Sequence, residues 1–287
     1  MPSPLPTKFL INQDFKFKIL VNAEDKTFTL PFIDQSPGYN CVVNWGDTTT
    51  DTITAYNDEE IAHTYTNAGT YIISIIGVCS AFYFSGGFEA LKLIEIISWG
   101  DVHLKLLKLA HAYNLISLPK NEYGRLREVT SFAATFSHCY GLIELPDGLL
   151  ANNHIATNFS YCFDDCNLLT TLPKHLFNGC ISGVDFNHCF LDCAELLMVP
   201  EELFKSSPLA LDFNNCFASC TSLTAIPAEL FLYNTIVEDF WSCFDSDSAL
   251  TGNAPTLWLR DPEPDGSGCF YGCTNLANYA TIPTAWK

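Results

Sequence analysis

The C-terminal two-thirds of this chain repeats itself with a period of 27 residues. One phenylalanine column shows the spacing: Phe132, Phe159, Phe186, Phe213 and Phe240. A second phenylalanine column, a leucine column, a proline column and two cysteine columns keep the same period. Repeats of about 20–50 residues are the signature of stacked architectures, in which one unit cannot bury its apolar face alone. We therefore expect residues spaced by 27 to lie above one another in a continuous core.

The repeating unit reads F-x-x-C-F-x-x-C-x-x-L-x-x-[LIV]-P-x-x-L-F. Its first half places apolar residues at i, i+3, i+4 and i+7, which is the spacing of one face of a helix. The stretch L-x-x-[LIV]-P is short, apolar and closed by proline, so it predicts a brief strand and a turn. For residues 101–287 we therefore expect an α+β repeat, in which every unit contributes a helical segment and a strand to a solenoid.

Both ends of the repeat depart from the pattern, as capping units do. Leu109 and Ala112 stand where phenylalanine and cysteine recur in later units. Near the C-terminus Ala254 replaces the proline and Asp247 replaces a cysteine.

The N-terminal part has a different pattern. Short alternating apolar runs separated by turn residues predict an all-β sandwich over residues 1–80. Residues 81–100 follow as a connector and solenoid cap, with a turn at Ser85-Gly86-Gly87 and an apolar stretch from Leu91 to Trp99. We expect that stretch to close the first repeat unit rather than to form a free linker.

Two short motifs in the N-terminal part resemble a known family. Residues 44–48 read NWGDT and residues 63–71 read HTYTNAGTY. These residues resemble a PKD-type immunoglobulin-like domain over about residues 8–80. The resemblance implies a spacer or adhesion module outside the cytoplasm or on a virion, with a structural role for His63.

The repeat itself also resembles a known family. Residues 216–227 read CFASCTSLTAIP and are similar to BspA-type leucine-rich repeats. The resemblance covers about residues 101–287. It implies a solenoid that is used for adhesion or partner binding and that has no catalytic residues.

Net charge and hydropathy limit the classes of partner and the locations that we expect for this chain. The formal net charge is −18, and such a surface repels phosphate backbones and anionic lipids, so nucleic acid and membrane are not expected partners. The N-terminal sequence lacks a signal-peptide pattern, and the sequence has no apolar stretch of about 18 residues. We expect a chain that is displayed on a virion after lysis or on a bacterial surface, as part of a larger assembly.

Thirteen cysteines are present, most of them in the two repeating columns. A zinc site needs four ligands that converge on one point, whereas a column spreads its sulfurs along an axis. Cysteine also suits places that need a small apolar side chain. We therefore favour buried free thiols; disulfides between units and a metal site are the alternatives.

The candidate catalytic residues form no recognisable constellation. His138 and His188 lie beside the columns without a local nucleophile motif, and the sequence has no glycine-rich phosphate loop. Carboxylate pairs such as Asp164-Asp165 occur, but a glycosidase needs two carboxylates at a set separation in a cleft. We expect no enzyme, no cofactor and no metal. The alternative is a carbohydrate-active enzyme that uses acidic residues on the solenoid face.

The positions that vary between units are the candidate binding site. They follow each column phenylalanine and are expected to face outward, and rigid solenoids bind partners through such residues. The candidates are Tyr161, His188, Asn215, Trp241 and Trp258. The alternative is that the aromatic residues among them belong to the cap or the core. The expected function is non-enzymatic recognition or assembly, with a protein or a glycan as the partner.

Overall fold

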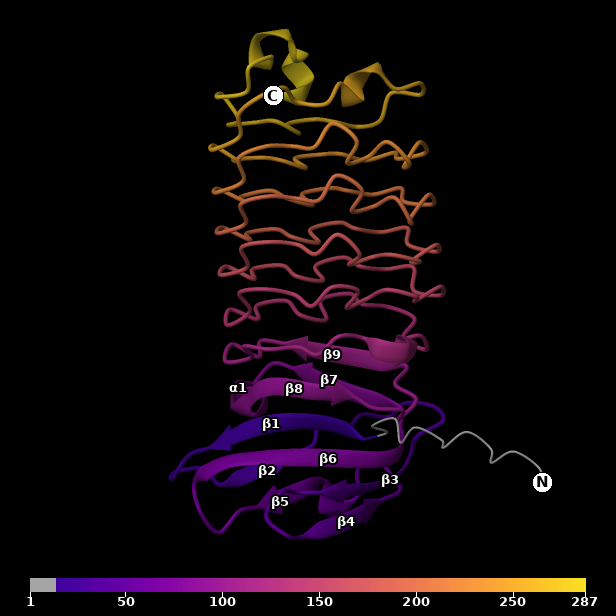
Figure 1. Cartoon of the computed structure of the whole chain (residues 1–287), viewed down its shortest axis with the longest axis vertical. Coiled ribbons are helices and arrows are strands. Elements are labelled where there is room, and N and C mark those ends of the chain that lie inside the picture. Colours follow the sequence, from indigo (N-terminus) through magenta and orange to yellow (C-terminus); the bar gives the residue numbers. More distant parts are fainter. Residues whose placement is uncertain (1–13) are drawn as a thin grey trace, which may run out of the picture.

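The computed structural model describes residues 14–287 as one elongated column. A β-sheet part lies at one end, flattened coils are stacked on it, and the C-terminus lies at the far end (Figure 1). The first thirteen residues, which begin the predicted 1–80 domain, lie outside the described part. No helix among the described residues is long and apolar enough to cross a membrane.

The N-terminal part is built on a five-stranded sheet in the order β4-β3-β6-β1-β8, in which all neighbouring strands are antiparallel. Its strands are β1 (Phe15–Val21), β3 (Tyr39–Asn44), β4 (Thr50–Ile53), β6 (Gly69–Cys79) and β8 (Leu93–Trp99). A two-stranded sheet of β2 (Thr27–Thr29) and β5 (Ala62–Thr64) accompanies it, and a 3-10 turn (Glu59–Ile61) precedes β5. Along β1 buried Phe15, Phe17 and Ile19 alternate with less buried residues, because successive side chains of a strand point to opposite faces.

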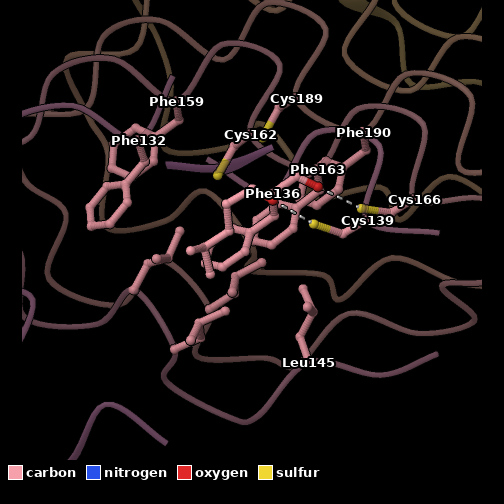
Figure 2. Close-up of a cluster of buried hydrophobic side chains, with 14 of the residues drawn as sticks. Phe132, Phe136, Cys139, Leu145, Phe159, Cys162, Phe163, Cys166, Cys189 and Phe190 are labelled. Atoms are coloured by element: carbon pink, nitrogen blue, oxygen red, sulfur yellow. Dashed lines mark hydrogen bonds between the residues drawn. The ribbon is translucent and has the colours of Figure 1, made fainter. Parts of the chain in front are cut away.

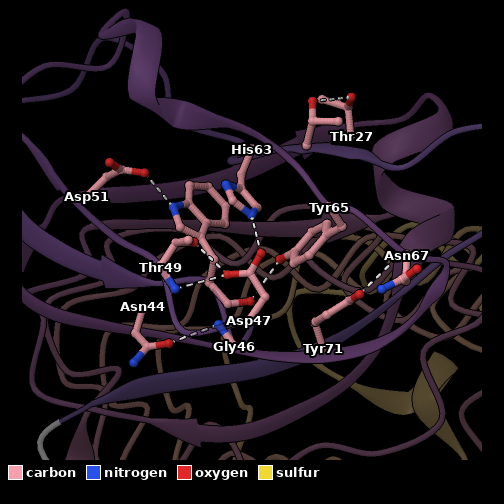
Figure 3. A network of polar contacts seen from close by, with 12 residues as sticks. Thr27, Asn44, Gly46, Asp47, Thr49, Asp51, His63, Tyr65, Asn67 and Tyr71 are labelled. Carbon is pink, nitrogen blue, oxygen red and sulfur yellow. Dashed lines mark hydrogen bonds and ion pairs between the residues drawn. The ribbon is translucent and has the colours of Figure 1, made fainter.

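The residues of the two N-terminal motifs meet in one cluster (Figure 3). The Trp45 ring stacks on His63 with 4.8 Å between centroids, and His63 Nε2 lies 2.8 Å from Asp47 Oδ2. The Tyr65 hydroxyl donates to the Trp45 carbonyl at 2.9 Å. Burial acts to raise the pKa of Asp47. Hydrogen bonds from Thr49 and His63 outweigh this effect and hold the pKa below its usual value. The cluster ties β5 to the turn after β3.

The segment between residues 81 and 100 contributes to both parts of the molecule. The strand β7 (Ala81–Ser85) pairs in parallel with β9 (Leu106–Ala110), and the one-turn helix α1 (Phe88–Lys92) leads into β8. On one side β8 pairs with β1. On the other side the Ile96 N–H donates to the Ser117 carbonyl at 3.0 Å. The sheet and the repeat are therefore joined by main-chain hydrogen bonds.

The predicted α+β solenoid is wrong, because residues 101–287 contain no α-helix. Among residues 14–287 the only α-helix is the five-residue α1; the other short helices are 3-10 turns at Glu59–Ile61, Glu122–Gly124, Leu257–Leu259, Tyr279–Thr281 and Thr284–Trp286. Each Phe-x-x-Cys forms a β-turn instead: the Cys162 N–H donates to the Phe159 carbonyl at 3.2 Å, and Tyr161 has a φ of 55°. A positive φ at the third position is typical of a type II turn. Two such turns in succession reproduce the i, i+3, i+4, i+7 spacing of a helix.

The predicted strand of each unit is reduced to single-residue bridges. Parallel bridges join Glu144 to Thr171 and Thr171 to Met198. The main contact between units lies at the turns, where every second N–H donates to the next unit. Phe159, Tyr161, Phe163 and Asp165 donate in this way at 2.7–2.9 Å. The fold is therefore a stack of turn-rich coils held by inter-unit hydrogen bonds.

Residues spaced by 27 lie above one another, as the period predicts. The rings of Phe159 and Phe186 are 5.1 Å apart and 4° from parallel, and Phe163 and Phe190 are arranged alike (Figure 2). The cysteines beside them are buried and free. Those of one column donate to a carbonyl of the preceding unit, as Cys166 Sγ does to Phe136 at 3.2 Å. Cysteine thus fills a small apolar space and also offers a weak donor.

Candidate binding surface

The two turns of each unit place one residue apiece in the left-handed backbone region. These residues form two columns with φ between 50° and 78°: Ala134, Tyr161, His188, Asn215, Ser242 and Gly268 in the first, and His111, His138, Asp165, Asp192, Ser219, Ser246 and Gly272 in the second. This conformation favours glycine, and a side chain there costs roughly 1–2 kcal/mol. In the last unit both positions are indeed glycine. Elsewhere side chains are retained at a cost in stability, and such outliers gather at functional sites.

Three of the predicted site residues occupy the first left-handed column in successive units. The Tyr161 ring stacks on His188 with 4.4 Å between centroids and 14° between planes. Asn215 follows in the next unit, where its Nδ2 donates to Asn214 Oδ1 at 2.5 Å. Burial lowers the pKa of His188, partly opposed by the charge of Asp212. The imidazole is therefore neutral at pH 7, and it can act as a hydrogen-bond donor and acceptor.

Trp241 stands beside this column in the unit after Asn215. Its side chain is exposed, with a residue exposure of 45%, and its backbone N–H donates to Asp239 Oδ1 at 2.6 Å. Trp258 lies elsewhere, in the 3-10 turn Leu257–Leu259 near the C-terminus. Its ring packs edge-on against Phe270 and Trp286, at 6.3 Å and 6.1 Å between centroids. The structure thus groups four of the five predicted residues and places Trp258 in the C-terminal cap. We call Tyr161, His188, Asn215 and Trp241 the variable face.

Sequence reasoning missed an acidic column next to the variable face. Parallel bridges connect its members, which are Asp185, Asp212, Asp239 and Asp265, and a further bridge connects Asp185 to the uncharged Asn158 of the preceding unit. The side chain of each accepts a hydrogen bond from the backbone N–H two residues on, as Asp212 Oδ1 does from Asn214 at 2.8 Å. Burial raises the pKa of Asp185, Asp212 and Asp239, and these hydrogen bonds oppose the shift. The 27-residue period that identified the phenylalanines could have found this column too.

A second polar cluster lies at the second left-handed column. The Ser137 hydroxyl donates to Asp164 Oδ2 at 3.0 Å and lies 2.7 Å from His138 Nδ1. The other ring nitrogen, His138 Nε2, is 3.4 Å from Asp165 Oδ2, to which the Tyr140 hydroxyl also donates. The Ser137 hydroxyl thus contacts both a carboxylate and an imidazole nitrogen. His138 therefore lies between the Ser137 hydroxyl, which is next to Nδ1, and the Asp165 carboxylate, which is next to Nε2.

Asp164 has the most perturbed carboxyl of that cluster. Burial raises its pKa to about 6, against the hydrogen bond from Ser137 and the charge of His138. Its side chain is 12% exposed. A carboxyl with this pKa is partly protonated near neutral pH and can donate a proton. Among residues 14–287 no three His, Cys, Asp or Glu side chains are arranged to hold a metal ion.

Comparisons with known proteins add one distant likeness. No family model matches the chain, and no curated protein matches it. Among solved structures, the chain is similar to a leucine-rich repeat protein from Bacteroides ovatus. The identity is 15%, the match covers 78% of this chain and 88% of that chain, and the TM-score is 0.19.

Proposed function

We propose that this chain is a non-enzymatic recognition or assembly protein that binds a protein or a glycan through the variable face. The observation that carries the proposal is the retention of Tyr161 and His188 at backbone positions that favour glycine. Stability alone would select glycine there, as in the last unit. We infer that Tyr161 and His188 are kept against that preference for binding. The stacked core beneath them holds them in fixed positions, which lowers the entropy lost on binding.

We further propose display on a virion or on a bacterial surface, with a PKD-type spacer and BspA-type repeats. The Trp45–Asp47–His63–Tyr65 cluster supports the first assignment, since it gives the motif residues a structural role. The uniform 27-residue columns support the second. Antibody labelling of native particles and cells in the electron microscope tests the location. We expect label on particles or on the cell exterior, and label confined to the cytoplasm would contradict display.

Glycine substitution separates binding from folding at the variable face. In the double variant Tyr161→Gly/His188→Gly we expect the free energy of unfolding to rise by about 1 kcal/mol, because two left-handed residues lose their strain and one ring stack is lost. We expect binding to fall at least tenfold. The measurements are chemical denaturation and binding to an array of immobilised oligosaccharides and purified surface proteins.

Ser219→Gly is the matched control for this double variant. It relieves the same strain in the second column, away from Tyr161 and His188. We expect it to stabilise the chain and to leave binding unchanged. If the double variant bound the array as well as the natural sequence does, the variable face would not be the binding site.

Asp164 supports a second candidate function, a carbohydrate-active enzyme. Its pKa of about 6 suits a general acid, and the Asp165 carboxylate is its neighbour in the sequence. The test is to incubate the same oligosaccharides with the chain and to analyse the products by mass spectrometry. Turnover that is abolished by Asp164→Asn would show that the chain is an enzyme and would contradict our first proposal. Binding without turnover supports our first proposal.

A further inference from the structure

An exposed phenylalanine stands at the junction of the sheet and the repeat. Phe88 opens α1 and is 82% exposed, the highest value for a large apolar side chain among residues 14–287. Gly86 and Gly87 precede it with φ of 100° and 90°, a conformation that a side chain would strain. This glycine pair sets the direction in which the short helix leaves β7. An exposed ring of this kind is typical of the anchor residues of protein interfaces.

Two hollows flank the Phe88 ring, and both are lined by Phe88 and Leu91. The first has a volume of about 380 Å³, and its other walls are Gly86, Gly87, His111 and Tyr113. The second has a volume of about 490 Å³ and includes Asn22, Glu24, Asp25 and Lys92. We call them the aromatic hollow and the acidic hollow.

The aromatic hollow has uncharged, well-supported walls. The Tyr113 ring stacks on Tyr140 at 4.7 Å, and its hydroxyl is 3.3 Å from His111 Nδ1. The His111 ring lies so close to Gly86 that a Cβ there would be 3.3 Å from it. Burial lowers the pKa of His111, and the nearby His138 and Lys108 add to the shift. The hollow therefore offers ring surfaces without a formal charge, which suits an apolar side chain.

The acidic hollow carries an excess of negative charge. Lys92 Nζ is 2.7 Å from Asp25 Oδ2 and 3.0 Å from Glu89 Oε1, and its side chain is 7% exposed. This one ammonium group pairs with the carboxylates of Asp25 and Glu89, and the charged residues of the lining are Glu24, Asp25 and Lys92. Within the lining, two carboxylates against the one ammonium group leave a net charge of −1. Such a hollow attracts a cation.

We propose that Phe88 and its two hollows bind a peptide segment of a partner protein in which an arginine or lysine is adjacent to an apolar residue. The apolar side chain enters the aromatic hollow. The cationic side chain lies over the Phe88 ring and reaches Glu24, so that it gains a cation–π contact and an ion pair. The site involves none of the residues of the variable face, so the chain has a second interaction surface.

Titration of the isotope-labelled full chain with acetyl-Arg-Leu-amide, followed by nuclear magnetic resonance, tests this site. We expect saturable shifts of the Leu91 and Tyr113 resonances and at least fivefold weaker binding of acetyl-Glu-Leu-amide. Phe88→Ala should weaken the binding of the arginine peptide at least fivefold. Glu24→Gln should weaken the binding of the arginine peptide more than the binding of an uncharged Leu-Leu peptide. Leu259→Ala, at a residue that is 72% exposed near the other end of the column, is the matched control.

Three outcomes would overturn the proposal: no saturable shift at these resonances, equal binding of the arginine and glutamate peptides, or unchanged binding to Phe88→Ala. Because Phe88 is mostly exposed, its variant is expected to fold, and its amide spectrum verifies this. The Glu24→Gln variant tests the charge with the ring in place. Saturable binding of a disaccharide instead of the peptides would also contradict a peptide site.

Discussion

Individual residues in left-handed conformations recur in this chain, and not all of them lie on the variable face. Thr48 has a φ of 81° in the turn after β3 and is exposed. A β-branched residue with positive φ is a clear outlier. Nothing in the contacts of Thr48 offsets this strain.

Replacing Thr48 by glycine is therefore expected to stabilise the chain by about 1 kcal/mol. The reference is Thr50→Gly in β4, where the backbone is extended and glycine should destabilise by roughly 0.5–1 kcal/mol. Guanidinium denaturation at pH 7 measures both variants. Equal effects of the two substitutions would show that the turn is not strained.

Asp247 is the one residue that breaks a cysteine column from within. It is fully buried, and in the described part of the chain neither carboxylate oxygen has a hydrogen-bond partner. Burial raises its pKa well above the usual value, and the nearby backbone N–H of Cys220 opposes the shift only in part. The folded state therefore binds a proton that the unfolded state releases above about pH 4.

This linkage predicts the sign of a pH effect. A raised carboxyl pKa favours folding below the unfolded value of about 4, and that contribution is lost as the pH rises through the folded pKa. Asp247→Cys should therefore raise the free energy of unfolding at pH 7.5 by about 1–3 kcal/mol, with a smaller gain at pH 5. Denaturation curves at both pH values measure the difference. A loss of stability, or a larger gain at pH 5, would contradict the assignment.

At the scale of the elements, the last unit shows how the stack ends. Gly266 stands in the first phenylalanine column, and a Cβ there would be 2.2 Å from the ring of Trp286. The indole thus fills the place of the missing phenylalanine, while its Nε1 donates to Glu263 Oε1 at 3.1 Å. The Phe270 N–H donates to the Trp286 carbonyl at 2.8 Å, which gives the last turn the inter-unit hydrogen bond it would otherwise lack.

Removal of this cap should loosen the C-terminal end first. Trp286→Ala is expected to lower the free energy of unfolding by about 3–5 kcal/mol, because it leaves a cavity beside Phe270. Gly266→Ala should act in the same direction by displacing the indole. Hydrogen exchange read by mass spectrometry should show faster exchange in residues 265–287 than in residues 132–163. Uniform acceleration along the whole chain would argue against a local cap.

At the scale of the whole molecule, the sheet and the coils form one continuous body. The strand β8 pairs with β1 and also contacts the first coil through Ile96, so no free linker separates the two parts. The core continues through both, and all thirteen cysteines are buried within it as free thiols. Burial raises the pKa of Cys162, Cys189 and Cys216, among others, which also suppresses the reactive thiolate.

A thiol titration tests this continuous core. Without reductant, the native chain should show almost no reaction with an aromatic disulfide reagent at pH 8. The denatured chain should release close to thirteen equivalents. A lower number after denaturation would reveal disulfides, and rapid reaction of several thiols in the native state would show that the coils open.

The sequence alone determined which residues share an environment. The 27-residue period placed the phenylalanines and cysteines in stacked columns, and it pointed to Tyr161, His188 and Asn215 as neighbours on successive units. The path of the chain between these residues was decided by the tertiary structure. A helix and two consecutive turns direct the same i, i+3, i+4 and i+7 residues inward, so apolar spacing cannot distinguish them.

Hydrogen bonds between units favour the two turns over a helix, and these hydrogen bonds exist only when the units are stacked. The N–H groups of Phe159 and Tyr161 donate to the following unit, and a helix would have used them internally. The same long-range pairing joins β8 to β1 and places Trp258 in the cap instead of on the surface. The local sequence indicates which side chains must be buried. Hydrogen-bond partners that are distant in the sequence decide which backbone conformation pairs the main-chain N–H and C=O groups.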